Sequence, residues 1–105
     1  MAKYVMAVYS NAQPGRDADY MRWYETVHMP EICTIPGVTG GHVYEAIPAS
    51  PAKPAATYLA IYDLDLDDPV TVLAEMGRRG AAGEMTMTDA IDTASAQITI
   101  LKQNF

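Results

Sequence analysis

Cysteine, positive charge and long apolar runs are all scarce in this sequence of 105 residues. The lone cysteine, Cys33, can form neither an internal disulfide nor a zinc knuckle. No apolar run approaches the roughly 20 residues that a membrane span requires. The first ten residues have the pattern of a strand rather than of a signal peptide. We therefore expect a cytoplasmic protein, in a reducing compartment, with no membrane partner.

Basic residues are few and scattered. Seven Lys and Arg stand against 13 Asp and Glu, which gives a formal net charge of −6. An acidic chain repels phosphate backbones, so we expect no nucleic-acid partner. Half of the residues are hydrophobic, which is typical of a globular protein. A chain of this length can bury one core but not two, so we assign residues 1–105 to a single domain.

Four segments have the composition and alternation of β-strands. The first and third are apolar on both faces, so both of their faces must be covered. Gly40 and Gly41 lie within the second and predict a bulge or a close backbone approach there. The predicted strands cover residues 3–9, 38–47, 57–64 and 95–102.

Two main helices are predicted between these strands. Residues 16–28 carry Tyr20 and Tyr24 at helical spacing, and Pro30 should disturb this helix near its end. A short helical continuation over residues 31–35 is an alternative, and Pro-Gly at residues 36–37 would end it. The second helix begins at Asp68 and Pro69, an N-cap acid followed by a proline at the first helical position. Gly80 is expected to end it, and a short helix is expected over residues 88–93.

The resulting order, β-α-β-β-α-β, predicts the α+β, ferredoxin-like fold: a four-stranded antiparallel sheet with two helices on one face. The helices leave the second face of the sheet uncovered, although the first and third strands are apolar on that face too. A second copy of the chain, packed sheet against sheet, would cover it economically. We therefore predict a homodimer.

One segment resembles a known family. Tyr20 is followed by two residues, Trp-Tyr, three residues, His28, one residue and Pro30, and then by Pro-Gly at residues 36–37. This pattern resembles the signature of EthD-like proteins of the dimeric α+β barrel superfamily. The resemblance implies the predicted fold over essentially the whole chain. It implies no single reaction, because the superfamily includes polyketide cyclases, muconolactone-type isomerases, hydroxynitrile lyases and cofactor-free monooxygenases.

His28 is the leading candidate for a catalytic residue. Its charge changes near neutral pH, which suits proton transfer in either direction. A position at the end of the first helix would favour the imidazolium form, whereas burial would oppose it. The resemblance implies an acid/base role for His28, in a cleft between helices and sheet. The alternative role is structural, with His28 capping the helix or bonding a backbone carbonyl.

Aromatic side chains supply the candidate substrate-binding residues. Tyr24 lies one helical turn before His28, and Tyr20 one turn before Tyr24, so both can line a pocket beside it. Tyr4 and Tyr62 lie on predicted strands and could orient a substrate oxygen through their hydroxyl groups. Trp23 is a further candidate, although packing between helix and sheet explains it better than contact with a ligand.

His42, on the second strand, is a secondary candidate. It could act with His28 as an acid/base pair, or it could simply face solvent. The spacing of His28, Glu31, His42 and Glu45 matches no compact metal motif, so we expect no metal site and no cofactor.

These observations favour a small cofactor-independent enzyme that acts on an apolar, oxygenated molecule, such as an aromatic or cyclic carbonyl compound. General acid/base catalysis by His28 would suit an isomerase, a cyclase or a lyase. The alternative is a non-catalytic protein that binds a hydrophobic small molecule, or an accessory protein in an oxygenase or degradation pathway. The resemblance allows that role, since the namesake of the family is associated with an ether-degrading monooxygenase system.

Overall fold

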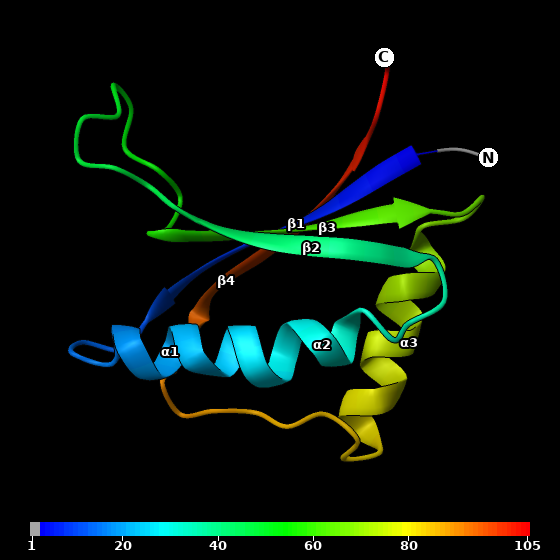
Figure 1. Cartoon of the computed structure of the whole chain (residues 1–105), viewed down its shortest axis with the longest axis horizontal. Coiled ribbons are helices and arrows are strands. Elements are labelled where there is room, and N and C mark those ends of the chain that lie inside the picture. Colours follow the sequence, from blue (N-terminus) through cyan, green and yellow to red (C-terminus); the bar gives the residue numbers. More distant parts are fainter. Residues whose placement is uncertain (1–2) are drawn as a thin grey trace.

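A computed structural model describes residues 3–105 and contains a four-stranded antiparallel sheet with helices against one face (Figure 1). The strands are β1 (Lys3–Ala12), β2 (Val38–Glu45), β3 (Tyr58–Asp65) and β4 (Ile91–Lys102). The helical elements are α1 (Asp17–Trp23), the π-helical turn η1 (Tyr24–His28), α2 (Met29–Ile32) and α3 (Val70–Ala81). The strand order β2-β3-β1-β4 confirms the ferredoxin-like fold. None of the helices in residues 3–105 combines the length and apolar character needed to cross a bilayer.

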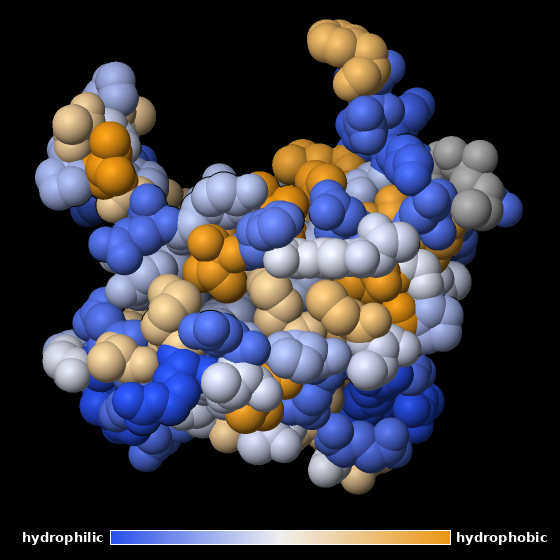
Figure 2. All heavy atoms as spheres, viewed as in Figure 1, coloured by the Kyte–Doolittle hydropathy of each residue, from blue (hydrophilic) through white to orange (hydrophobic). Residues whose placement is uncertain are grey.

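The two faces of the sheet differ in what covers them. On the face that meets the helices, the side chains of β1 and β3 are buried; they include Met6, Ser10, Tyr58, Ala60, Tyr62 and Leu64. On the opposite face, Val5, Tyr9, Leu59 and Ile61 are only partly buried, and no helix lies over them. Apolar side chains are visible along this upper, helix-free side in Figure 2. The prediction that β1 and β3 are apolar on both faces is confirmed.

The last strand is longer than predicted, and the helix expected over residues 88–93 is wrong. β4 begins at residue 91, and Asn11 at the end of β1 lies opposite Asp92. A register shift interrupts the pairing of the two strands, and Ser95 bridges it. Its Oγ accepts the Asn11 N–H at 2.8 Å and donates to the Asp92 carbonyl at 2.6 Å. Pairing with a distant strand, which no local pattern reveals, determines the conformation here.

The second predicted helix begins as expected but ends later. The Asp68 carboxylate accepts a backbone N–H at the start of α3, at 3.1 Å. Gly80 lies inside the helix, and Gly83 ends it with a φ of 70°. The Glu84 N–H then donates to the Arg79 carbonyl at 2.8 Å, which is the long bond of a Schellman motif.

The first predicted helix continues past His28 through α2 to Ile32, the continuation that the sequence allows. The Met29 N–H donates to the Tyr24 carbonyl, five residues back, which is the hydrogen bond of a π-helical turn. Pro30 has no N–H and would leave a gap in a regular α-helical ladder. The wider turn lies immediately before Pro30, so the predicted disturbance is a change of helical register rather than an end.

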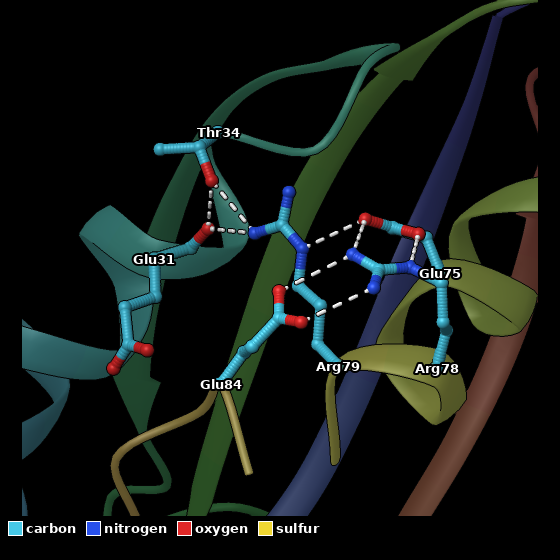
Figure 3. Close-up of polar contacts among 6 residues, drawn as sticks. All are labelled: Glu31, Thr34, Glu75, Arg78, Arg79 and Glu84. Atoms are coloured by element: carbon cyan, nitrogen blue, oxygen red, sulfur yellow. Dashed lines mark hydrogen bonds and ion pairs between the residues drawn. The ribbon is translucent and has the colours of Figure 1, made fainter. Parts of the chain in front are cut away.

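An arginine of α3 caps the end of α2 (Figure 3). The Arg79 guanidinium donates to the Glu31 backbone carbonyl at 3.2 Å and to Thr34 Oγ1 at 2.7 Å. It also donates to the Glu75 carboxylate at 2.9 Å. Hydrogen bonds from Arg78 and Arg79 lower the pKa of Glu75 to about 2. A cation therefore lies where the helix dipole favours one, and this cation is Arg79 rather than His28.

Gly41 lies where a side chain would not fit. The pairing of β2 with β3 shifts register between Val38 and Gly40, as the glycine pair predicts. A Cβ on Gly41 would lie 3.0 Å from the Tyr62 ring and 3.0 Å from the end of the Met29 side chain. A Cβ on Gly40 would meet only an oxygen of Asp63, at an ordinary 3.7 Å.

We expect Gly41→Ala to lower the free energy of unfolding by about 1–3 kcal/mol, because the added methyl group overpacks the wall formed by Tyr62 and Met29. Gly40→Ala is the matched control and should change this free energy by less than about 0.5 kcal/mol. Urea unfolding of the three proteins measures the difference. Equal losses in the two variants would contradict the close approach at Gly41.

Candidate functional site

Most of the predicted site residues lie together, between the first helical segment and the inner face of the sheet. Tyr20 and Trp23 come from α1, Tyr24 and His28 from η1, and Tyr62 from β3. Tyr20, Tyr24 and Tyr62 are 1–2% exposed, so they are fully buried, and His28 is half-buried. The structure thus brings His28 together with several of the aromatic residues that the sequence analysis singled out.

The π-helical turn brings Trp23 onto the face of His28. In a regular α-helix, residues five apart lie about 140° apart around the axis. In the register of η1 the two rings stack instead, with centroids 4.3 Å apart and planes inclined by 16°. The Tyr24 ring meets His28 at nearly a right angle, at 5.2 Å. The imidazole is therefore held by the Trp23 ring, which stacks on its face, and by the Tyr24 ring, which lies perpendicular to it.

Burial keeps the imidazole of His28 neutral. Desolvation lowers the pKa of His28 from 6.5 to about 4, and the Glu31 carboxylate opposes this shift to a smaller extent. Nδ1 is buried and has no hydrogen-bond partner in residues 3–105. The helix continues past His28, so no helix end offsets the burial. The structural alternative, in which this nitrogen bonds a backbone carbonyl, is not what the geometry shows.

The buried tyrosines are hydrogen-bond donors. Burial raises the pKa of Tyr24 and of Tyr62, so both hydroxyl groups stay protonated. The Tyr20 hydroxyl and Ser10 Oγ are 2.5 Å apart and share a hydrogen bond. The Tyr62 hydroxyl is buried and has no hydrogen-bond partner in residues 3–105. The site therefore contains one unpaired hydroxyl group and one unpaired imidazole nitrogen.

The aromatic cluster extends toward the far end of the sheet. Tyr20 stacks on Tyr58 with ring centroids 4.7 Å apart. The Tyr58 hydroxyl donates to the Asp17 carboxylate at 2.6 Å, and this bond raises the pKa of Tyr58 to about 12. Tyr4, a predicted substrate-binding residue, is half-buried on the inner face of β1 and packs against the core. Tyr4 therefore borders the same core, and no aromatic stacking joins it to His28.

The two histidines lie on opposite faces of the sheet. His42 is exposed on β2 and pairs with Ile61, whose side chain is on the helix-free face. The neighbouring aromatic ring is Tyr44, at a centroid distance of 6.3 Å. An acid/base pair of His28 and His42 within one chain is therefore wrong, because successive strand residues alternate between faces and place His42 outside.

Within residues 3–105, neither a group of metal-binding side chains nor a surface hollow indicates a functional site apart from the one around His28. In residues 3–105, no three His, Cys, Asp or Glu side chains are grouped to hold a metal ion. A hollow of about 250 Å³ lies in the loop between β2 and β3 and is lined by residues 46–57, Ile47 and Pro48 among them. None of the predicted site residues lines it.

Sequence reasoning missed three residues that contact the site. Ser10 follows the alternation of β1 and could have been recognised as a polar residue on the core face. Glu31 lies three residues after His28, but its carboxylate accepts the backbone N–H of Thr86, at 3.2 and 3.3 Å. Thr86 lies in an irregular segment far along the chain, and no local sequence pattern indicates that it contacts Trp23.

We expect acidification to destabilise the protein through His28. The unfolded chain binds this proton near pH 6.5 and the folded chain only near pH 4. The free energy of unfolding should therefore decrease progressively as the pH falls from about 6.5 to about 4, and the total decrease should be about 3 kcal/mol. Urea unfolding at pH 7 and at pH 4.5 should show a smaller loss for His28→Gln than for the wild type. Equal losses would contradict the burial of a neutral imidazole.

Known protein structures share this fold at low sequence identity. No protein-family profile matches the sequence, and no curated protein matches it significantly. The crystal structure of an EthD-family protein from Bacillus halodurans C-125 is similar, with a TM-score of 0.62 and 19% identity over 98% of this chain and 99% of that chain. The crystal structure of HapK from Hahella chejuensis is similar too, with a TM-score of 0.50 and 18% identity over 100% of this chain and 92% of that chain. The chain therefore shares its fold with an EthD-family protein, as its sequence resemblance predicts.

Proposed function

We propose that this chain is a small enzyme that works without a cofactor and uses His28 as a general base. Its substrate would be an apolar, oxygenated molecule such as an aromatic or cyclic carbonyl compound. The observation that carries the proposal is the buried, unpaired Nδ1 of a neutral imidazole between Trp23 and Tyr24. An unpaired buried polar atom costs about 1–3 kcal/mol, and a bound substrate offers the missing partner.

The chemistry follows from which groups carry a proton. His28 is neutral, so Nδ1 can accept a proton from the carbon next to a carbonyl group. The electron pair of the broken C–H bond moves through the new C=C bond onto the carbonyl oxygen. The Tyr62 hydroxyl, protonated and unpaired, can donate a hydrogen bond to that oxygen. Return of the proton from His28 to a different atom gives an isomer. Alternatively, the enolate carbon attacks a second carbonyl group and closes a ring, and the alkoxide formed there takes the proton back from His28.

The surroundings favour an apolar and flat substrate. The rings of Trp23 and Tyr24 contact His28, and such rings prefer to pack against other flat, apolar groups. Cys33, which is free and half-buried, supports a reducing compartment such as the cytoplasm.

The second candidate is a protein that binds the same class of molecule without transforming it, as an accessory to an oxygenase or a degradation pathway. The low pKa of His28, about 4, favours this candidate because it makes the imidazole a weak base. The two candidates differ in one observable, the transfer of a proton.

We expect the wild-type protein to catalyse deuterium incorporation next to the carbonyl group of at least one compound in a panel of aromatic and cyclic ketones in D₂O. NMR spectroscopy measures the rate. His28→Gln should lower it by about 100- to 10,000-fold, the usual contribution of a general base. Tyr62→Phe should lower it less, because the base remains.

Binding is followed separately through Trp23, the lone tryptophan, whose fluorescence reports on the surroundings of His28. Fluorescence changes without deuterium incorporation would support the non-catalytic candidate. Equal incorporation by the wild type and His28→Gln would contradict the role of His28.

We also propose that a second copy of the chain covers the helix-free face of the sheet. The side chains on this face support a sheet-to-sheet contact. The apolar ones are Val5, Ala7, Tyr9, Tyr44, Leu59, Ile61 and Leu101, and of these Tyr44 and Leu101 are about half exposed in one chain. Burial of such a face contributes roughly 25 cal/mol for each Å² of apolar surface removed from water.

Light scattering after size-exclusion chromatography should give about twice the chain mass of 11.4 kDa. Ile61→Glu, on this face, should shift the mass toward one chain because it buries a charge in the interface. Val70→Glu is the matched control, since Val70 is 60% exposed on α3. A wild-type mass of one chain would reject the dimer.

A further inference from the structure

The segment of residues 82–90, here called the strap, links α3 to β4 and runs along the helical layer (Figure 1). Two side chains of that layer hold it at one residue, Thr86. The Trp23 indole N–H donates to the Thr86 carbonyl at 2.8 Å. The Thr86 N–H donates to the Glu31 carboxylate, at 3.2 and 3.3 Å from its two oxygens. Both backbone groups of Thr86, its N–H and its carbonyl, are therefore hydrogen-bonded to side chains of the helical layer.

The same two side chains flank His28. Trp23 lies flat against the imidazole, with centroids 4.3 Å apart. The Glu31 carboxylate is the charged group that raises the pKa of His28 against the effect of burial. One residue therefore sets the plane of the imidazole and the other sets its electrostatic surroundings.

We propose that Trp23 and Glu31 are positioning residues for His28, and that the backbone of Thr86 fixes both of them. The strap is then part of the site, although none of its side chains is needed there. This inference rests on the proposed function, because the orientation of His28 matters for catalysis only if His28 transfers a proton.

The geometry gives the physical reason. The indole of Trp23 has a single polar group, and with its N–H bound to Thr86 the ring cannot turn without breaking that bond. A fixed indole plane fixes the imidazole that stacks on it and keeps Nδ1 directed into the core. Because its N–H is bound inside the protein, Trp23 acts through His28 rather than by donating a hydrogen bond to a substrate.

The test uses the imidazole NMR signals of the full-length protein. The chain has two histidines, and His42, on the other face of the sheet, is an internal reference. Trp23→Phe keeps a flat ring but removes the N–H donor, and we expect it to shift and broaden the His28 signals while those of His42 stay unchanged. Glu31→Gln keeps an acceptor for Thr86 but removes the charge, so we expect the pKa of His28 to fall further.

The deuterium-incorporation rate provides the second readout. Trp23→Phe should lower it about 10- to 100-fold, as expected for a misplaced catalytic group, with little change in substrate binding. Asp89→Asn is the matched control, because Asp89 lies on the same strap but pairs with Arg16. It should change neither the His28 signals nor the rate.

The two proposals fail in different ways. Unchanged His28 signals in Trp23→Phe and Glu31→Gln would overturn the positioning role, whatever the activity. Altered His28 signals in the two variants, together with no deuterium incorporation by the wild type, would support the positioning geometry and overturn the proposed function and the catalytic role of the strap. An effect of Asp89→Asn as large as that of Trp23→Phe would show a general loosening of the strap and would also overturn the role of Thr86.

Discussion

The site depends on one contact, the stacking of the His28 imidazole on the Trp23 indole. That contact exists because the helix changes register in η1, and the change lies immediately before Pro30, which cannot complete an α-helical ladder. In a straight α-helix, His28 would still meet Tyr24, but Trp23 would point elsewhere. This change of helical register, next to a proline, thus places the histidine in a buried position between two rings.

Burial then determines the protonation of His28 and of the buried tyrosines Tyr24 and Tyr62. Removing a group from water disfavours its charged form, so the same environment lowers the pKa of His28 and raises that of Tyr24 and Tyr62. One physical cause therefore produces a neutral proton acceptor beside neutral hydrogen-bond donors. No charged partner or metal ion is needed for this division of roles, and it suits reactions that move a proton on an uncharged carbonyl compound.

Much of the fold could be predicted from the sequence, because the evidence is local. The alternation in β1 and β3, the Asp68 cap and the close approach at Gly41 each follow from a few neighbouring residues. The helical spacing of Tyr20, Tyr24 and His28 also indicates that these side chains lie on one face, and their rings are neighbours in the structure.

The rest depends on contacts between distant parts of the chain. The start of β4 is set by pairing with β1, and Thr86 meets Trp23 across 63 positions of sequence. The stacking of Trp23 on His28 depends on a π-helical turn, and the helical spacing of 3.6 residues used to interpret the sequence does not bring these two side chains together.

The most direct test of the account is an NMR titration of the His28 imidazole, with and without aromatic carbonyl and phenolic compounds. The account predicts a His28 that stays neutral down to about pH 5 and whose signals move when such a compound binds. A His28 that titrates near pH 6.5 and responds to no compound would contradict it.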